Sequence, residues 1–205
     1  MILLASAVAQ ELGFWHPREG VESLVTGVGP VEASCAVAAA LAQRRYRLVV
    51  NAGIAGAFGG AAQIGDGVVV ADDAMELALE SGAPLALSLG IELADKAASD
   101  AALVARLRAT GFPALHGITV AHVTSTEATA RRLLERGAQV ESMEGFAVLR
   151  AAERAGVPAI ELRGISNRCG DRTSSGWDFA AGVAGLRAVV NALFELPDVG
   201  TEKVR

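Results

Sequence analysis

Short runs of apolar residues alternate along this chain with longer, alanine-rich stretches of helical character. Six runs are predicted as β-strands because they are apolar, short and rich in β-branched residues; they cover residues 2–8, 21–28, 47–51, 66–71, 116–123 and 159–165. Five stretches are predicted as helices: 30–43, 100–109, 125–136, 144–155 and 179–196. Strands that alternate with helices are typical of an α/β fold with a largely parallel sheet.

The segments between these elements differ in character. Residues 53–60 are rich in glycine and are predicted as a loop, where the backbone can approach a ligand closely. Residues 75–97 have weak periodicity, so we expect an irregular segment that lies over a site. The polar residues 197–205 are expected to be a frayed tail. Because the chain has neither repeats nor a low-complexity linker, residues 1–196 are expected to form one domain.

The composition limits the classes of protein to which the chain can belong. Hydrophobic residues make up 52% of the 205 and charged residues 20%, which excludes a disordered chain. The net charge is −5 without a basic patch, so we expect no nucleic-acid partner. Two uncharged stretches, 48–65 and 109–126, are interrupted by glycine, proline and polar residues, so we expect no membrane segment. The apolar start lacks a basic region and fits a first strand better than a signal peptide.

The sequence lacks the motifs of several common functional sites. Cys35 and Cys169 fit neither a metal-binding spacing nor a disulfide framework, which indicates no metal site and a reducing, cytoplasmic setting. The pair Gly27 and Gly29 lacks the third glycine of a dinucleotide-binding motif, and no lysine stands in a phosphate-binding loop. The sequence also lacks the Gly-x-Ser-x-Gly motif of serine hydrolases.

Two carboxylates and one polar cluster remain as candidates for chemistry. Glu11 directly follows the first predicted strand, at the edge where α/β proteins bind ligands. Glu144 begins an apolar helix, where it either serves a site or is an ordinary first-turn acid favoured by the helix dipole. Residues 163–172 end a strand with polar side chains. Turn chemistry explains the asparagine, glycine and aspartate there, but not Arg168 together with Arg172.

At these residues the sequence resembles the purine nucleoside phosphorylase/nucleosidase superfamily. Four blocks match in order: Ala7-Val-Ala-Gln-Glu11, Asn51-Ala-Gly-Ile-Ala-Gly56, Glu141-Ser-Met-Glu-Gly145 and Arg163-Gly-Ile-Ser-Asn167. The last two blocks are the most specific, and the resemblance runs from residue 1 to about residue 190. It implies a single-domain, three-layer α/β/α fold with a central mixed, largely parallel sheet, in which residues 1–196 form the catalytic domain.

The resemblance also implies roles for residues in these blocks. Glu11 matches the catalytic glutamate and is suited to act as general base on water. Met143 and Glu144 match the ribose-binding motif, in which the thioether packs on the sugar and the carboxylate accepts from its hydroxyls. Asn167 stands where members that cleave adenine have aspartate; its amide can donate to a 6-oxopurine, which implies hypoxanthine as the leaving group. The other substrate-binding residues implied are Gly53, Ile54, Ala55, Arg168 and Trp177.

Within the superfamily, the chain is most similar to the futalosine hydrolases, enzymes of the alternative menaquinone route. The similarity lies in residues 51–58, 119–126 and 165–178, although the Asp171–Arg172 order is the reverse of the usual one. Bacterial phosphorylases of the superfamily grip phosphate with an arginine where Asn51 stands here, so water is the expected nucleophile. The implied reaction is hydrolysis of futalosine to hypoxanthine and dehypoxanthinyl futalosine, with neither metal nor organic cofactor.

Two other functions stay open. One is a methylthioadenosine/S-adenosylhomocysteine nucleosidase, against which Asn167 argues because those enzymes place aspartate there. The other is a non-catalytic nucleoside-binding protein, against which the presence of Glu11 beside Glu144 and Asn167 argues. The resemblance further implies a homodimer or larger homo-oligomer, in which a neighbouring subunit helps to close the site.

Overall fold

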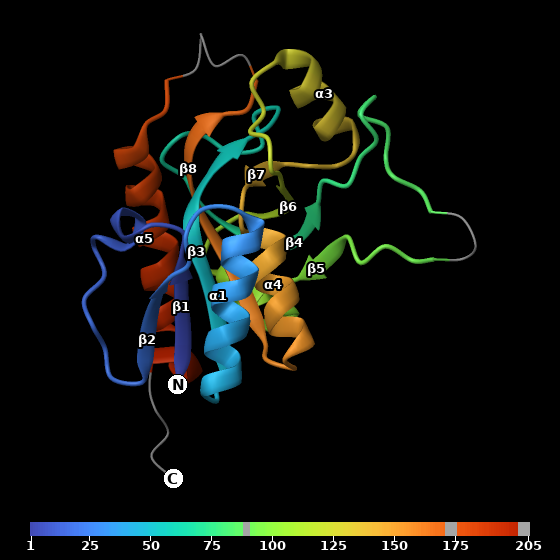
Figure 1. Ribbon diagram of the computed structural model, residues 1–205. Helices are drawn as coiled ribbons and strands as arrows, with labels where there is room; N and C mark the ends of the chain where they lie inside the picture. The colour runs from blue at the N-terminus through green and yellow to red at the C-terminus, as the bar shows by residue number, and fades with distance from the viewer. Residues whose placement is uncertain (88–90, 171–175, 201–205) are drawn as a thin grey trace.

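The computed structural model describes residues 1–87, 91–170 and 176–200 (Figure 1). Its strands are β1 (Ile2–Ser6), β2 (Val21–Val25), β3 (Leu48–Ala57), β4 (Gly67–Met75), β5 (Lys96–Ala98), β6 (Ala114–Thr119), β7 (Val140–Ser142) and β8 (Ala159–Arg168). Its helices are the 3-10 helix η1 (Ala9–Leu12), α1 (Pro30–Gln43), α2 (Ala101–Ala109), α3 (Glu127–Glu135), α4 (Gly145–Arg154), α5 (Phe179–Glu195) and α6 (Pro197–Gly200). Every predicted strand and helix is confirmed, with shifted ends.

The described strands belong to one mixed sheet, and five of them close into a ring. β3 pairs with β8, β8 with β4, β4 with β6, β6 with β7, and β7 with β3. β1 and β2 extend the sheet from β3, and β5 extends it from β4. The pairs β3–β7, β4–β8 and β4–β5 are antiparallel, and the remaining pairs are parallel. The predicted α/β fold with a mixed sheet is therefore confirmed.

The ring departs from the three flat layers that the resemblance implied. The first half of β3 pairs with β1, whereas Gly56 and Ala57 pair with β7. A bulge between Ala55 and Gly56 shifts the register against β8, and bulges bend the strand that carries them. The sheet is therefore open and layered at one end and closed at the other.

Helices cover both faces of the open part of the sheet, with α5 on one side and α1 with α4 on the other (Figure 1). Side chains alternate across β1: Leu4 packs in the core under α5, whereas Leu3 and Ala5 pack under α1 and α4. A separate apolar core, which includes Val68 and Ile165, involves the strands of the ring. These cores fix the strand ends that carry the polar residues.

The prediction of a glycine-rich loop over residues 53–60 is wrong for its first half. Residues 53–57 continue β3, because β8 pairs with this stretch along one side and β7 with its end on the other. β7 itself was not predicted, since three residues are too few to show a period of two.

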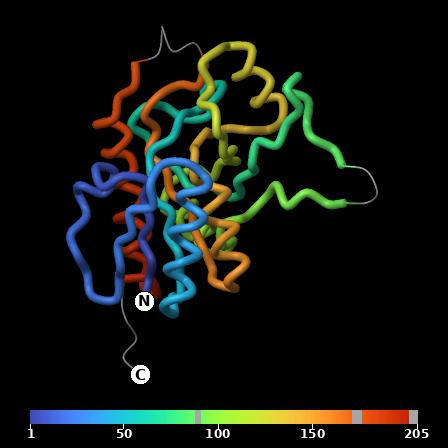
Figure 2. Tube along the Cα trace, in the orientation of Figure 1, coloured from blue at the N-terminus to red at the C-terminus, as the bar shows by residue number. Residues whose placement is uncertain are grey.

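Residues 76–87 and 91–95, between β4 and β5, form an arm that extends to the side of the molecule (Figure 2). Its described part is largely irregular, as predicted, with one bridge between Ala78 and Pro84. Arg132 of α3 holds the arm by pairing with Glu76 at 2.8 Å and donating to the carbonyl of Gly82 at 3.0 Å. The described residues of the arm do not line the cavity reported below, so the expected position over the site is not seen.

The prediction of a frayed tail is wrong for residues 197–200. Residues 197–200 form α6, in which Val199 is buried against the core under α5. Arg47 donates to the carbonyl oxygens of Asp198 and Val199 at 3.0 and 2.7 Å. Residues 201–205 lie outside the described residues. Throughout the described ranges, no helix has both the length and the apolar character that crossing a membrane requires.

Candidate active site

A cavity of about 300 Å³ opens where the carboxyl ends of the parallel strands β1, β3 and β8 meet. This is the edge at which α/β sheets bind ligands. The cavity is lined by Ala7, Val8, Glu11, Val28, Ile54, Ala55, Gly56, Val123, Glu141, Met143, Glu144, Ser166, Asn167, Trp177 and Phe179. An apolar wall with a few convergent polar groups is typical of a small-molecule site.

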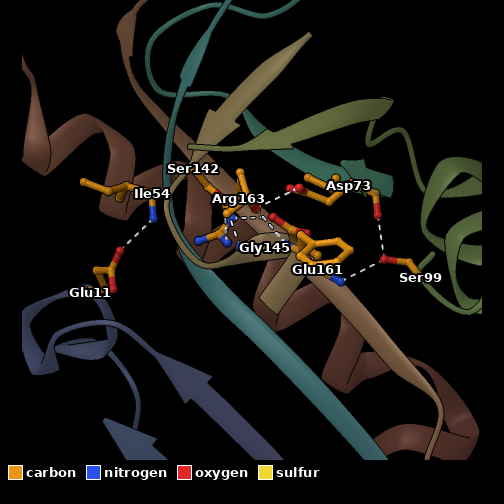
Figure 3. Close-up of polar contacts among 11 residues, drawn as sticks. Glu11, Ile54, Asp73, Ser99, Ser142, Gly145, Glu161 and Arg163 are labelled. Carbon is orange, nitrogen blue, oxygen red and sulfur yellow. Dashed lines mark hydrogen bonds and ion pairs between the residues drawn. The ribbon is translucent and has the colours of Figure 1, made fainter. Parts of the chain in front are cut away.

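Glu11 is held in this cavity by three backbone N–H groups. The chain turns into η1 soon after β1, and this turn carries the carboxylate to β3. Its Oε2 accepts from Ala7 at 3.0 Å and Val8 at 3.2 Å. Its Oε1 accepts from Ile54 at 2.9 Å (Figure 3). The side chain is buried. A carboxylate that is fixed in this way can act on a bound molecule without first reorganising.

Burial raises the pKa of Glu11 above its ordinary value, because the charged form loses contact with water. The N–H of Ile54, the positive charge of Arg163 and the N–H of Val8 oppose this rise in pKa, whereas Glu144 adds to it. A carboxylate with a raised pKa binds a proton more tightly, which is the property that a general base needs.

Arg163 approaches Glu11 through the space left by Gly53. A methyl group on Gly53 would overlap Nη1 of Arg163 and would lie 2.9 Å from Oε1 of Glu11. Gly53 was predicted to bind substrate, but it is not among the residues that line the cavity. Because Gly53 has no side chain, it instead leaves room for Arg163 and Glu11 to face each other. Arg163 was not predicted as a site residue, although it begins one of the four motif blocks.

Glu144 stands immediately before α4, beside Met143, and both residues line the cavity. The carboxylate is buried, and its Oε1 accepts from the N–H of Gly29 at 2.8 Å. It does not cap the N–H groups of its own helix. The bond to a distant segment argues against the alternative of an ordinary first-turn acid.

Glu141 also lines the cavity and was not predicted as a site residue. Its carboxylate is buried and accepts from both the N–H and the hydroxyl of Thr124. This contact fastens the segment after β6 to β7, next to Val123 in the wall of the cavity. Glu141 could have been found from the sequence, because it is the first acidic residue of the Glu141–Gly145 block.

The end of β8 brings Asn167 to the cavity with a fixed amide orientation. Its Nδ2 donates to the carbonyl oxygen of Arg168 at 3.2 Å, and its Oδ1 lies 3.0 Å from the hydroxyl of Ser166. Because a carbonyl can only accept, the nitrogen must be the atom on that side. Trp177 donates from Nε1 to the same hydroxyl at 3.0 Å. The second N–H of the Asn167 amide can therefore donate to a ligand.

The structure brings together most of the predicted site residues. Those that line the cavity are Glu11, Ile54, Ala55, Met143, Glu144, Asn167 and Trp177. Arg168 does not line it; this exposed side chain donates to Gln63 at 3.2 Å instead. Residues 171 and 172 of the polar cluster lie outside the described residues. In the part of the chain that is described, no group of three or more histidine, cysteine or acidic residues is placed to hold a metal ion.

The chain belongs to the phosphorylase superfamily, whose family model matches residues 18–196. A futalosine hydrolase from Streptomyces coelicolor is 38% identical over 186 residues, which cover 85% of this chain and 79% of that protein. Within the superfamily, the chain therefore belongs to the futalosine hydrolase family. This confirms the resemblance that the motifs in the sequence indicated.

Solved structures share the fold at much lower identity. The native structure of futalosine hydrolase from Helicobacter pylori aligns with a TM-score of 0.79 at 15% identity, covering 94% of this chain and 96% of that one. A 5'-methylthioadenosine/S-adenosylhomocysteine nucleosidase from Neisseria meningitidis, solved with methylthio-immucillin-A, aligns with a TM-score of 0.76 at 16% identity, covering 94% and 97%. At these identities the alignments establish the fold alone.

Proposed function

We propose that this protein hydrolyses the N-glycosidic bond of futalosine and releases hypoxanthine and dehypoxanthinyl futalosine. The observation that carries the proposal is Glu11, a buried carboxylate with a raised pKa that faces a cavity shared with Glu144 and Asn167. These three groups supply a base, an acceptor for sugar hydroxyls and a donor for a purine. The proposed scheme uses neither a metal nor an organic cofactor.

The reaction replaces a carbon–nitrogen bond by a carbon–oxygen bond. Water attacks the anomeric carbon while Glu11 takes one of its protons, and the bonding pair of the broken bond goes to the purine nitrogen. An N–H of Asn167 stabilises the charge that develops on the base; Glu11 then releases its proton to solvent, and the purine takes up one proton from solvent. General-base help of this kind is worth roughly 10²–10⁴-fold in rate.

Glu144 is suited to the ribose. Gly29 holds one of its oxygens, and a carboxylate has enough lone pairs to accept further bonds from sugar hydroxyls. Met143, the neighbouring lining residue, can pack on the apolar face of the sugar. The ring is thereby held with its anomeric carbon toward Glu11.

The amide of Asn167 favours a 6-oxopurine over a 6-aminopurine. The N–H that it presents can donate to N7 or O6 of hypoxanthine, whereas the amino group of adenine is itself a donor. A buried donor that faces a donor costs about 1–3 kcal/mol, or roughly 5- to 150-fold in kcat/KM. We therefore expect the wild-type protein to prefer futalosine to aminofutalosine by a factor in this range.

Replacement of Asn167 by Asp is expected to reverse part of this preference. A carboxyl group can supply a proton to N7 and accept from the amino group of adenine, so relative activity toward aminofutalosine should rise at least about tenfold. Competition kinetics with both substrates, with released bases separated by chromatography, measure this ratio. Arg168→Gln serves as the matched control, because the Arg168 side chain lies outside the cavity. An unchanged ratio in the Asp variant would leave Asn167 without a part in base choice.

The two alternatives make different predictions in the same assay. A methylthioadenosine nucleosidase would release adenine from methylthioadenosine faster than hypoxanthine from futalosine; its fold is shared, but Asn167 opposes it. A non-catalytic binding protein would retain futalosine without releasing base, and would have no use for a carboxylate held as Glu11 is. Cys35 is a free thiol, which suits the reducing cytoplasm, where we propose that the protein works.

We also propose that the protein is a homodimer whose interface includes the outer face of α1. Along this helix Val31 is 69% exposed, and Cys35, Ala38 and Ala42 on the same stripe are exposed as well. The only charged side chain of α1 is Glu32. A helix that is apolar on its outer face is normally covered. Val28, just before α1, lines the cavity, so a second copy at this face would narrow the cavity mouth.

Ala38→Glu is expected to dissociate this dimer. Burying an unpaired carboxylate at the interface costs several kcal/mol, so the dimer dissociation constant should rise at least about 100-fold. Light scattering coupled to size-exclusion chromatography measures the mass of both proteins. Ala101→Glu, on the exposed first turn of α2 across the sheet, should leave the dimer intact. A wild-type protein that is monomeric and fully active at micromolar concentrations would refute the proposed interface.

A further inference from the structure

A buried cluster of charged residues lies beside Glu11 of the candidate active site (Figure 3). Asp73 on β4 and Glu161 with Arg163 on β8 are all at most 1% exposed. Glu161 and Arg163 are two residues apart in one strand, so their side chains lie on the same face of β8. Leu162 between them packs on the opposite face, in the core under α5. Charged groups in such a place are costly unless they are paired, so their arrangement demands an explanation.

Arg163 is fixed by two donated bonds that determine the direction of its third nitrogen. Its Nε donates to Oε1 of Glu161 at 2.8 Å, and its Nη2 donates to the hydroxyl of Ser142 at 3.2 Å. A guanidinium is planar, so these two contacts set the direction of Nη1. Nη1 points to Gly53, where it faces Oε1 of Glu11.

Asp73 is the second acidic residue of this cluster. Thr119 accepts from the N–H of Phe146 at 2.7 Å and uses its own hydrogen to donate to Oδ1 of Asp73 at 2.8 Å. A proton on Asp73 therefore belongs on Oδ2, which faces Glu161 across Gly145. Burial and the negative charge of Glu161 raise the pKa of Asp73 well above its ordinary value. Burial raises the pKa of Glu161 as well, but the charge of Arg163 and its hydrogen bond oppose this rise, so Arg163 favours the charged form of Glu161.

Three carboxylates act on Arg163 through their charge: Glu161, Glu144 and Glu11. Burial lowers the pKa of Arg163, but Glu161, Glu144 and Glu11 raise it, in that order of effect, and the net change is a rise. Glu161 is thus the main partner of the guanidinium charge. Because that charge is largely balanced on one side, it acts less strongly on Glu11 on the other side.

We propose that Glu161 is a positioning residue that orients Arg163 toward Glu11 and balances its charge, so that Glu11 keeps its ability to take a proton from water. This inference rests on the proposed hydrolysis. It concerns a residue that does not touch the cavity and acts only through Arg163.

Glu161→Gln separates charge from shape, because the amide oxygen can still accept from Nε of Arg163. In the variant, Arg163 would act more strongly on Glu11 and lower its pKa. Ionised Glu11 is the active form, so kcat/KM for futalosine falls at low pH as Glu11 becomes protonated. This acid limb of the plot of kcat/KM against pH should move to lower pH by about one unit. The weaker base should lower kcat about tenfold at neutral pH. A residue with a purely structural role would not shift the acid limb.

Controls keep the inference separate from the proposed function. If the wild-type protein releases no hypoxanthine from futalosine, the proposed hydrolysis fails first. If the wild-type protein does release hypoxanthine, the role of Glu161 is overturned when Glu161→Gln has the same acid limb and the same kcat as the wild type. Asp73→Asn, which mimics a protonated Asp73, should leave the acid limb in place, as should Glu153→Gln on the surface of α4. If Glu161→Gln does not fold, Glu161→Asp should lower kcat without moving the acid limb; full kcat there would contradict the inference.

Discussion

Replacement of Glu11 by Gln is expected to lower kcat for futalosine hydrolysis by roughly 10²–10⁴-fold, the usual worth of a general base. The amide cannot take a proton from water, although it has the size of the carboxylate. Substrate affinity should change little, because the ribose and the base are assigned to Glu144 and Asn167. Single-turnover release of hypoxanthine measures kcat, and equilibrium binding of a non-hydrolysable nucleoside analogue measures affinity.

The surroundings of Glu11 define the control for this variant. Three N–H groups, from Ala7, Val8 and Ile54, point at its two oxygens, and an amide has only one oxygen to offer them. The variant should therefore lose at least one bond and about 1–2 kcal/mol of stability. Glu135→Gln, at the exposed end of α3, should change neither kcat nor stability. A kcat within about tenfold of the wild type would assign the base to another lining carboxylate, such as Glu141.

The sequence was informative about this site because the site lies at strand ends. Glu11 follows β1 and Asn167 ends β8, and the carboxyl ends of parallel strands meet at one edge of a sheet. The sequence alone therefore predicts that these two residues lie together, although most of the chain separates them. Arg168, which the resemblance assigned to the substrate, lies outside the cavity, because neighbouring side chains on a strand point to opposite faces.

The closed ring and the charged cluster could not be predicted in the same way. β7 is three residues long, and residues 53–57 are rich in glycine, so neither gives a strand pattern, although both help to close the sheet. The cluster does leave a signal in the sequence: Glu161 and Arg163 interrupt an apolar strand at a spacing of two. That spacing places two opposite charges on one buried face, which is rarely accidental.

Gly164→Ala is expected to destabilise the protein by at least about 3 kcal/mol, the upper end of what overpacking usually costs. At Gly164 the backbone of α5 lies close against β8. A methyl group there would overlap the carbonyl oxygen of Gly182 and lie 2.5 Å from the backbone nitrogen of Leu186. Both are backbone atoms of a helix that is packed along its length, so α5 must move as a unit. The midpoint of urea unfolding, followed by circular dichroism, measures the loss.

The movement of α5 should also disturb the site. A methyl group on Gly182 would lie 2.8 Å from the Cβ of Ser166, which shows how tightly α5 packs beside the residue that bonds Asn167 and Trp177. Activity should therefore fall even where Gly164→Ala remains folded. Gly176→Ala is the matched control, because a methyl group there meets none of the described residues within 4 Å and its backbone is not in the left-handed region. Its stability should stay within about 0.5 kcal/mol of the wild type. Equal midpoints for the two variants would mean that α5 does not fix the end of β8, and the orientation assigned to Asn167 would then lack its support.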